Sequence, residues 1–372
     1  MTASAMKAPQ FFMSDTETKF MRRALQLAAL GRYDAHPNPM VGAVIVHDGR
    51  IIGEGWHRLC GQAHAEVNAV ASVKDKSLLK NSTLYVTLEP CSHYGKTPPC
   101  AELIIRCAIP RVVVASVDPF EKVAGRGIAL LREAGVEVVV GVLDDEARRL
   151  NRRFFTAHTL RRPYVTLKWA QSIDGWLDRK RNANEKAAAF STPLSAIAVH
   201  QLRAEHDAVL TTAATVMADN PRLNVRHWAT SRQPQRIVID RRAVLNSDAN
   251  SIISSEYDIF AKSDLPTILF ANSNNLGEKV IHVPTDENEP FENILRHLYS
   301  KGITSVLIEA GGRFLQAVLD AGLWDEIRVE IAPFSLGNQG NIPSPTLPSN
   351  ITLLDTEHIG KNNINRYVRA GH

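Results

Sequence analysis

A histidine, a glutamate and two cysteines, at His64, Glu66, Cys91 and Cys100, restrict the folds that this chain can adopt. One imidazole and two thiolates can hold a single Zn²⁺ if a helix start and a strand end bring them together. Three protein ligands leave a fourth position open for water. Glu66 lies two residues from His64 and need not be a ligand, so it can act as the base that moves a proton. We therefore expect His64, Cys91 and Cys100 to bind one zinc ion beside a catalytic Glu66.

The order H-x-E followed by P-C is typical of zinc deaminases that act on nucleobases and related rings. Here the second cysteine follows the first after eight residues rather than two. The intervening loop contains His93, Lys96 and Thr97, and a cation and a hydroxyl on a short loop suit a phosphate group. The alternative for these side chains is an ordinary solvated loop.

The length of 372 residues favours two domains, and a net charge of +4 without basic runs argues against a large nucleic-acid surface. Four cysteines do not form a disulfide framework in a chain of this length, and metal-binding thiols favour a reducing compartment. Residues 1–14 read as a loose leader without a signal-peptide core, and no apolar run approaches a membrane span. We expect a cytoplasmic protein with no membrane partner.

Strand and helix patterns alternate along the first part of the chain, which predicts an α/β domain with a sheet covered on both faces. The segment Arg161-Arg162-Pro163 interrupts this series, so we place one domain at 15–160 and a second at 161–372. Strands are expected at 41–46, 51–55, 83–88, 111–117 and 136–142, and helices from about 15, at 63–73, from Cys100, at 125–134 and at 144–158.

A second strand–helix series follows the boundary and predicts another α/β domain. A helix is expected at 193–205, and the segment 338–350, rich in proline, asparagine and serine, reads as a loop. The expected strands are 164–169, 208–211, 236–240, 267–271, 305–309 and 326–331.

With these motifs in place, the chain resembles the RibD family of bifunctional deaminase–reductases over nearly its whole length. The loop between the two cysteines is far more specific than a general deaminase signature. The matching stretches are 36–42 (HPNPMVG), 64–66 (HAE), 87–100 (TLEPCSHYGKTPPC), 118–119 (DP), 123–127 (VAGRG), 167–168 (LK), 172–175 (SIDG), 202–204 (LRA), 214–221 (ATVMADNP) and 309–311 (EAG).

The resemblance implies a cytidine-deaminase-like three-layer α/β/α domain followed by a dihydrofolate-reductase-like α/β domain. The first would deaminate 2,5-diamino-6-(5-phosphoribosylamino)pyrimidin-4(3H)-one with zinc. The second would reduce the ribosyl group with NADPH to give 5-amino-6-(5-phosphoribitylamino)uracil in riboflavin biosynthesis. The expected partner is this small phosphorylated pyrimidine, and the expected assembly is a homodimer.

The resemblance also implies site residues. In the deaminase, Asn38 and His57 would line the pocket, and His93, Lys96 and Thr97 would hold the ribose phosphate. The remaining residues belong to the reductase: Lys168, Arg203, Leu223, Arg226 and Glu309 on the substrate side, and Ala170, Thr215, Asp219, Gly311 and Gly312 on the cofactor side.

The place of some residues directly after an expected strand also suggests contacts with the cofactor. Gly311-Gly312 follows an expected strand, where glycines allow the backbone to approach a pyrophosphate, although most such pairs are turns. Arg241 and its neighbour Arg242 follow the expected strand 236–240 and could bind the adenosine 2′-phosphate, or they could form an exposed basic turn.

The segment 176–192 departs from the family. It is a few residues longer, and Ala187 to Ala189 stand where contacts to substrate and nicotinamide are expected, with Phe190 or Trp176 as possible aromatic replacements. Because the cofactor carries the chemistry of hydride transfer, we expect the reductase to tolerate this change. The alternatives are an active deaminase whose C-terminal domain only binds nucleotide or dimerises, and a deaminase of tRNA or nucleobases.

Overall fold

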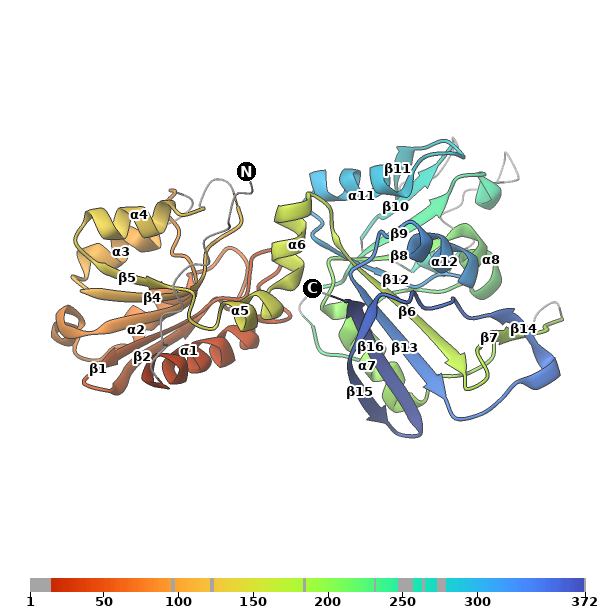
Figure 1. Ribbon diagram of the computed structural model, residues 1–372. Coiled ribbons are helices and arrows are strands. Elements are labelled where there is room, and N and C mark those ends of the chain that lie inside the picture. The colour runs from red at the N-terminus through yellow and green to blue at the C-terminus, as the bar shows by residue number, and fades with distance from the viewer. Residues whose placement is uncertain are drawn as a thin grey trace, which may run out of the picture. The chain divides into compact units, whose positions relative to one another are not determined.

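The computed structural model describes residues 15–94, 98–120, 124–182, 185–230, 232–246, 257–262, 265–272 and 279–370. Contacts divide the chain into two compact units, one up to Thr159 and one from Leu160 onward (Figure 1). No helix in the described ranges is both long enough and apolar enough to cross a membrane.

The first unit is built on a five-stranded mixed sheet with the order β2-β1-β3-β4-β5. The first pair is an antiparallel hairpin whose turn residues, Asp48 and Gly49, both have positive φ, as a two-residue turn of this kind requires. β3 pairs with β1 antiparallel and with β4 parallel. The expected strands are confirmed, with bounds Gly42–His47 (β1), Arg50–Trp56 (β2), Thr83–Leu88 (β3), Arg111–Ser116 (β4) and Glu137–Val140 (β5).

Helices cover both faces of this sheet, as predicted. One face packs against α1 and α5, and the other against α2, α3 and α4. The bounds are Asp15–Ala28 (α1), Ala65–Ser72 (α2), Cys100–Arg106 (α3), Arg126–Glu133 (α4), Asp144–Leu150 (α5) and Arg152–Leu160 (α6), with 3₁₀ turns at Ala29–Gly31 (η1) and Lys76–Asn81 (η2).

Two glycines of β2 let α2 lie very close to the sheet. A Cβ built on Gly55 would overlap the backbone of Ala69, and one on Gly53 would come within 2.7 Å of the Ala69 carbonyl oxygen. This close approach positions the start of α2 against the sheet. His64 is the residue before the helix, and Glu66 lies in its first turn.

The segment expected to form one helix over 144–158 forms two, α5 and α6, which separate at Asn151. The buried Asn151 amide accepts a hydrogen bond from the Met40 N–H and donates one to the Met40 carbonyl, both at 2.8 Å. A side chain paired in this way with a distant backbone explains why the helix does not continue.

The second unit contains a nine-stranded sheet with the order β11-β10-β9-β8-β12-β6-β13-β16-β15. The strands from β11 to β13 are parallel to their neighbours, and β16 and β15 extend the sheet antiparallel. The bounds are Tyr164–Ser172 (β6), Ala208–Thr212 (β8), Gln235–Asp240 (β9), Thr267–Ala271 (β10), Val280–Pro284 (β11), Ser305–Ile308 (β12), Glu326–Ala332 (β13), Ile351–Ile359 (β15) and Asn362–Arg369 (β16).

Helices again pack on both faces: α11 and α12 on one, and α7, α8 and α10 on the other. The expected helix from Pro193 is present and opens with a capping box in which the Thr192 side chain accepts the Ser195 N–H. The bounds are Pro193–Ala204 (α7), Ala213–Asp219 (α8), Asp258–Ala261 (α10), Phe291–Ser300 (α11) and Gly312–Asp320 (α12), with 3₁₀ turns at Val244–Asn246 (η3) and Gly337–Gln339 (η4).

The prediction of a loop throughout 338–350 was wrong in part. Gly340–Pro343 forms a strand, β14, that pairs antiparallel with Trp176–Arg179 (β7). The Trp176 ring occupies the space where a Cβ of Gly340 would stand, so the pairing depends on a glycine at that position.

Candidate active sites in the two units

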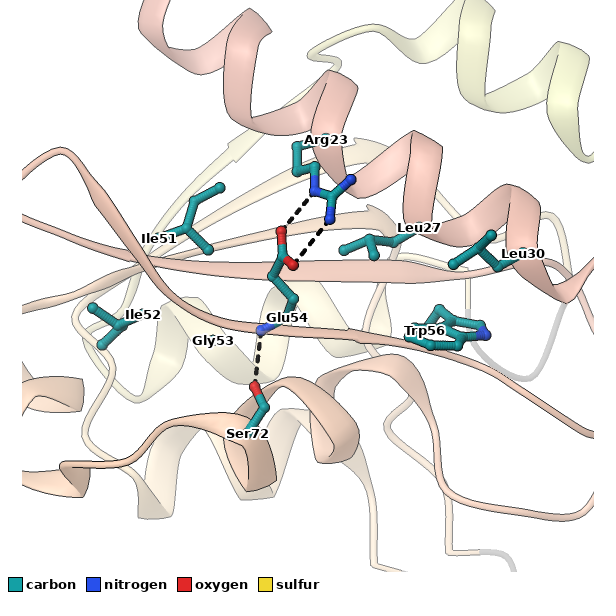
Figure 2. Close-up of a pocket in the computed structure, with 9 residues that line it drawn as sticks. All are labelled: Arg23, Leu27, Leu30, Ile51, Ile52, Gly53, Glu54, Trp56 and Ser72. Atoms are coloured by element: carbon teal, nitrogen blue, oxygen red, sulfur yellow. Dashed lines mark hydrogen bonds and ion pairs between the residues drawn. The ribbon is translucent and has the colours of Figure 1, made fainter.

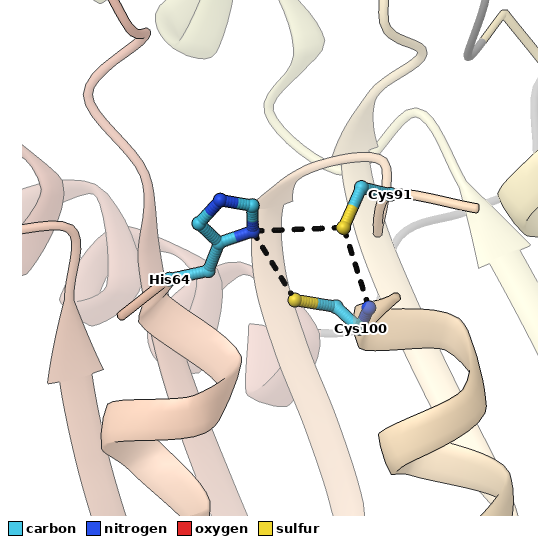
Figure 3. Close-up of side chains that lie close together, drawn as sticks. All are labelled: His64, Cys91 and Cys100. Carbon is cyan, nitrogen blue, oxygen red and sulfur yellow. Dashed lines mark hydrogen bonds between the residues drawn. The ribbon is translucent and has the colours of Figure 1, made fainter. Parts of the chain in front are cut away.

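The side chains of His64, Cys91 and Cys100 converge in the first unit, as Figure 3 shows. His64 Nδ1 lies 3.5 Å from Cys91 Sγ and 3.4 Å from Cys100 Sγ. The backbone N–H of Cys100, the first residue of α3, also donates to Cys91 Sγ at 3.3 Å. The three ligand atoms predicted from the sequence are therefore brought together from the start of α2, the end of β3 and the start of α3.

These separations fit a tetrahedral zinc ion. Zinc bonds of about 2.3 Å to sulfur and about 2.0 Å to nitrogen place the nitrogen and sulfur atoms roughly 3.6 Å apart. Hydrogen bonds from Cys100 and from His64 lower the pKa of the Cys91 thiol to about 4, so this sulfur is readily available as a thiolate. In the part of the chain that the structure describes, no other histidine, cysteine or carboxylate group forms such a cluster.

Glu66 is buried next to this cluster, with 3% of its surface exposed. Burial, together with the neighbouring Cys91 charge, raises the pKa of the Glu66 carboxyl to about 7. A carboxyl with a pKa near 7 can both accept and return a proton at neutral pH.

Asn38 and His57 form a second pair beside the metal ligands. The His57 ring meets the His64 ring edge-on, with 5.6 Å between the ring centroids. His57 Nδ1 lies 3.1 Å from the Ala63 carbonyl oxygen and must carry the proton, because a carbonyl only accepts. His57 Nε2 therefore accepts from Asn38 Nδ2 at 3.1 Å. No described residue donates to Asn38 Oδ1, which can accept a hydrogen bond from a ligand.

The Glu89 carboxylate holds the strand end that leads to Cys91. It is buried and accepts four backbone N–H groups, from Asp118, Gly125, Gly127 and Ile128, at 2.9–3.3 Å. A Cβ on Gly127 would overlap the Pro90 carbonyl, so the start of α4 fits against this strand end only with a glycine.

Of the three residues expected to hold a phosphate, His93 is exposed on the segment after Cys91. Lys96 and Thr97 lie outside the described residues.

A separate groove of about 520 Å³ lies between α1 and the edge strand β2 (Figure 2). An ion pair crosses it, with Arg23 Nε 2.6 Å from Glu54 Oε1. None of its lining residues belongs to the metal cluster, and no residue expected from the sequence lies in it.

In the second unit, Lys168, Arg203 and Glu309 form one charged cluster. Arg203 donates two hydrogen bonds to the Glu309 carboxylate, at 2.6 and 2.9 Å. Burial alone would raise the pKa of Glu309, but the Arg203 charge and hydrogen bonds hold it at about 2. Burial lowers the pKa of Lys168, while Glu309 and Glu330 oppose this effect.

The other two expected substrate residues belong to the segment that precedes β9. Leu223 is buried and has a φ of +50°, and Arg226 is exposed. Burial and the nearby Arg203 charge lower the pKa of Arg226.

The expected cofactor residues lie at the carboxyl edge of the parallel strands. A Cβ built on Gly311 would be 4.0 Å from Thr215 Oγ1, so the start of α12 and the start of α8 meet there. Arg241 follows the last residue of β9, and its buried Nε has no hydrogen-bond partner among the described residues. Gly312 opens α12, and Ala170 lies on β6 two residues after Lys168.

Asp219, also expected on the cofactor side, is exposed at the end of α8. Its carboxylate accepts from Arg181 Nη2 at 3.1 Å. Arg181 in turn pairs with the buried Asp178 of β7, 2.6 Å away. Arg181 therefore connects the lengthened segment after β7 to Asp219, an expected cofactor residue.

Both aromatic residues of this segment are engaged within the domain. The buried Phe190 stacks on Phe334 with 5.6 Å between ring centroids, and its carbonyl accepts from Asn362. Trp176 packs on Gly340, as described above. Ser191 donates to the buried Glu330 at 2.7 Å and anchors the end of the segment to β13.

Comparison with known proteins agrees with this division of the chain. The family described as cytidine and deoxycytidylate deaminase zinc-binding region matches residues 14–116, which include all three metal-cluster residues. The family described as RibD C-terminal domain matches residues 163–364. The riboflavin biosynthesis protein RibD of Aquifex aeolicus is 41% identical over 328 residues, covering 87% of this chain and 88% of the relative. The chain belongs to the RibD family.

Other RibD proteins give the same result. The Escherichia coli protein is 38% identical over 335 residues, covering 86% of this chain and 88% of its own. Solved RibD structures from Acinetobacter baumannii (TM-score 0.83) and of a deaminase/reductase from Thermotoga maritima (TM-score 0.82) are each 34% identical. Each comparison covers 95% of this chain and 99% of the solved one. The expected cytidine-deaminase-like and reductase-like α/β folds are confirmed.

Glu89 was not predicted as a site residue from the sequence. A signal was present, because a carboxylate directly between the apolar strand 83–88 and Pro90-Cys91 needs buried partners, and the glycine-rich stretch 124–127 offers backbone amides.

Proposed function

We propose that this protein carries out two successive steps of riboflavin biosynthesis. Its first unit would deaminate 2,5-diamino-6-(5-phosphoribosylamino)pyrimidin-4(3H)-one, and its second would reduce the ribosyl group with NADPH to give 5-amino-6-(5-phosphoribitylamino)uracil. The observation that carries the proposal is the cluster of His64, Cys91 and Cys100 beside the buried Glu66. The name of the Thermotoga maritima relative, a diaminohydroxyphosphoribosylaminopyrimidine deaminase and 5-amino-6-(5-phosphoribosylamino)uracil reductase, supports the choice of substrate.

In the deaminase, His64, Cys91 and Cys100 would hold zinc. When bound, the metal supplies a Lewis acid that activates water for attack. Glu66 takes a proton from the attacking water and passes it to the amine that leaves as ammonia, while a carbonyl replaces the amine on the ring. A pKa of about 7 suits both transfers.

The pair of Asn38 and His57 would orient the pyrimidine. Burial lowers the pKa of His57 and keeps the ring neutral, so Nε2 remains an acceptor for the Asn38 amide. Asn38 Oδ1 is then directed to accept from a ring N–H or amino group of the substrate. His93, with Lys96 and Thr97, would bind the ribose phosphate through charge-assisted hydrogen bonds.

In the reductase, Lys168, Arg203, Leu223, Arg226 and Glu309 would form the substrate side. The Arg203–Glu309 pair fixes the carboxylate, and a fixed carboxylate can accept hydrogen bonds from sugar hydroxyls. The exposed Arg226 is available for the phosphate.

NADPH supplies the hydride when it is bound. We assign its pyrophosphate to the backbone at Gly311 and Gly312, at the N-terminus of α12, where backbone amides can donate to an anion. Ala170, Thr215 and Asp219 would complete the cofactor side. Arg241, with its unpartnered Nε, would bind the 2′-phosphate.

Two further assignments complete the proposal. The metal-binding thiols favour a reducing compartment, so we place the protein in the cytoplasm. We also propose that it works as a homodimer, which sedimentation analysis would test.

The deciding experiment supplies zinc-loaded protein with the diaminopyrimidinone substrate and follows the products by mass spectrometry, first without and then with NADPH. We expect the deaminated product alone at first, and the ribityl product after NADPH is added. Deamination without further change, with NADPH still bound, would show that the second unit only binds nucleotide. No deamination by the zinc-loaded protein would refute the substrate, and a salt-sensitive shift of tRNA would then favour a nucleic-acid deaminase.

A further inference from the structure

Three side chains, from Arg203, Gln233 and His200, hold the backbone of residues 224–226. Arg203 Nη1 donates to the Asn224 carbonyl at 3.1 Å. Gln233 binds Val225 through both of its amide atoms: Oε1 accepts from the Val225 N–H, and Nε2 donates to the Val225 carbonyl, each at 2.8 Å. His200 Nδ1 accepts the Arg226 N–H at 3.1 Å. Three consecutive residues without regular secondary structure are therefore fixed by side chains.

The contacts of His200 define the tautomer and the charge of its ring. Because the Arg226 N–H can only donate, His200 Nδ1 must be an acceptor, and the ring proton is on Nε2. The side chain comes from α7, is 3% exposed, and meets the His227 ring edge-on with 4.8 Å between centroids. Burial and the charges of Arg203 and Arg226 lower the pKa of His200 to about 4, so the ring is neutral at neutral pH.

The Arg226 guanidinium has no carboxylate partner among the residues that the structure describes. Arg203 is neutralised by Glu309, and Arg222 pairs with Asp258. Arg226, by contrast, donates only to the Asn224 amide oxygen, at 3.1 Å, and forms no ion pair within the described residues. Its charge is thus available to an anionic ligand.

We infer that His200 is a positioning residue of the reductase, which sets the Arg226 guanidinium for the substrate phosphate by holding the Arg226 backbone N–H. Gln233 supports this by holding the preceding residue, Val225, through both of its amide atoms. The inference rests on the proposed reductase function. It adds a residue that touches neither substrate nor cofactor, and it explains why a buried neutral imidazole stands among arginines.

The test compares His200→Phe, which keeps a ring but removes the acceptor, with His200→Asn, whose Oδ1 can stand near the position of Nδ1. Reduction of the deaminated substrate is measured at saturating NADPH. We expect His200→Phe to raise KM for this substrate about tenfold with little change in kcat, because one buried N–H loses its partner and Arg226 loses its orientation. His200→Asn should restore KM to within about twofold of the wild type. The KM for NADPH should not change.

The dephosphorylated form of the same substrate separates positioning from general damage. If His200 acts through the phosphate contact, wild type and His200→Phe should differ little on this form. An equal loss on both forms, or a His200→Asn variant as impaired as His200→Phe, would overturn the inference.

Two controls keep the result interpretable. The deaminase rate of each variant reports on the integrity of the rest of the chain and should equal that of the wild type. If His200→Phe does not fold, Gln233→Met removes both bonds to Val225 and should raise the same KM. If KM stays at the wild-type value in either variant, the inference about His200 is overturned and the proposed reductase function is not affected. If the wild-type protein itself does not reduce the substrate, the proposed reductase function is refuted as well.

Discussion

The Glu89 carboxylate accepts the backbone N–H of Gly127 at 2.9 Å and thereby joins the end of β3 to the start of α4. Three more N–H groups converge on the same carboxylate. Because Cys91 follows two residues later, these four bonds also hold the strand end that carries a metal-binding residue.

Replacing Glu89 with glutamine should destabilise the deaminase unit. The glutamine NH₂ group would face backbone donors, and leaving buried N–H groups unpaired costs about 2–3 kcal/mol. We expect the melting transition of this unit to fall by roughly 5 °C or more, and zinc to be lost to a chelator faster than from the wild type. The exposed Glu133 of α4 provides the control, since Glu133→Gln should change neither quantity.

Glu66→Gln should abolish deamination without removing the metal. We expect the deaminase rate to fall at least about 100-fold, because glutamine cannot accept and return a proton. Metal analysis should still find one zinc per chain, and reduction of substrate supplied in deaminated form should continue. A variant that retains deamination within a few-fold of the wild type would rule out Glu66 as the proton carrier.

Arg241→Ala should weaken NADPH selectively. Loss of one charge-assisted contact to the 2′-phosphate should raise KM for NADPH by about tenfold and leave KM for NADH unchanged. Arg296→Ala, at an exposed position of α11, is the control and should change neither KM value. Equal losses with both cofactors would show that Arg241 does not contact the 2′-phosphate.

The Arg203–Glu309 pair predicts an acid-sensitive reductase unit. The pKa of Glu309 is about 2 in the folded protein, compared with an ordinary value of 4.5. Between these values the unfolded chain binds more protons than the folded one, so the stabilisation is complete above pH 4.5 and is lost as the pH falls towards 2. The contribution is on the order of 3 kcal/mol.

Urea unfolding of the second unit at pH values from 2.5 to 6 measures this effect. Glu309→Gln should lower stability at pH 6 and flatten its decline below pH 4.5 relative to the wild type. Glu292→Gln, at an exposed position of α11, should leave the slope unchanged. The same slope in Glu309→Gln and wild type would contradict the prediction.

The metal cluster could be predicted from the sequence because its chemistry is encoded in short local patterns. His64 and Glu66 lie on one helix start, and Cys91 and Cys100 each follow a proline directly. Short apolar runs rich in β-branched residues likewise predicted the central strands of both sheets, since these strands are buried.

The features that the sequence did not reveal depend on contacts between distant residues. The separation of α5 from α6 follows from the pairing of Asn151 with Met40, and β14 exists because Trp176 covers Gly340. The contact between His200 and the backbone of Arg226 is of the same kind. No local propensity signals a side chain whose partner is a backbone group elsewhere in the fold.

The two hydrogen bonds between Asn151 and the Met40 backbone also determine where the chain can be cut to express the deaminase unit separately. Met40 lies two residues after Asn38, so the amide that ends α5 supports the segment that carries a proposed substrate contact. The helices before the boundary are therefore part of the deaminase rather than a dispensable tether. A fragment ending before Asp144 would lack this support, whereas one continuing to Thr159 would retain it together with the rest of the first unit.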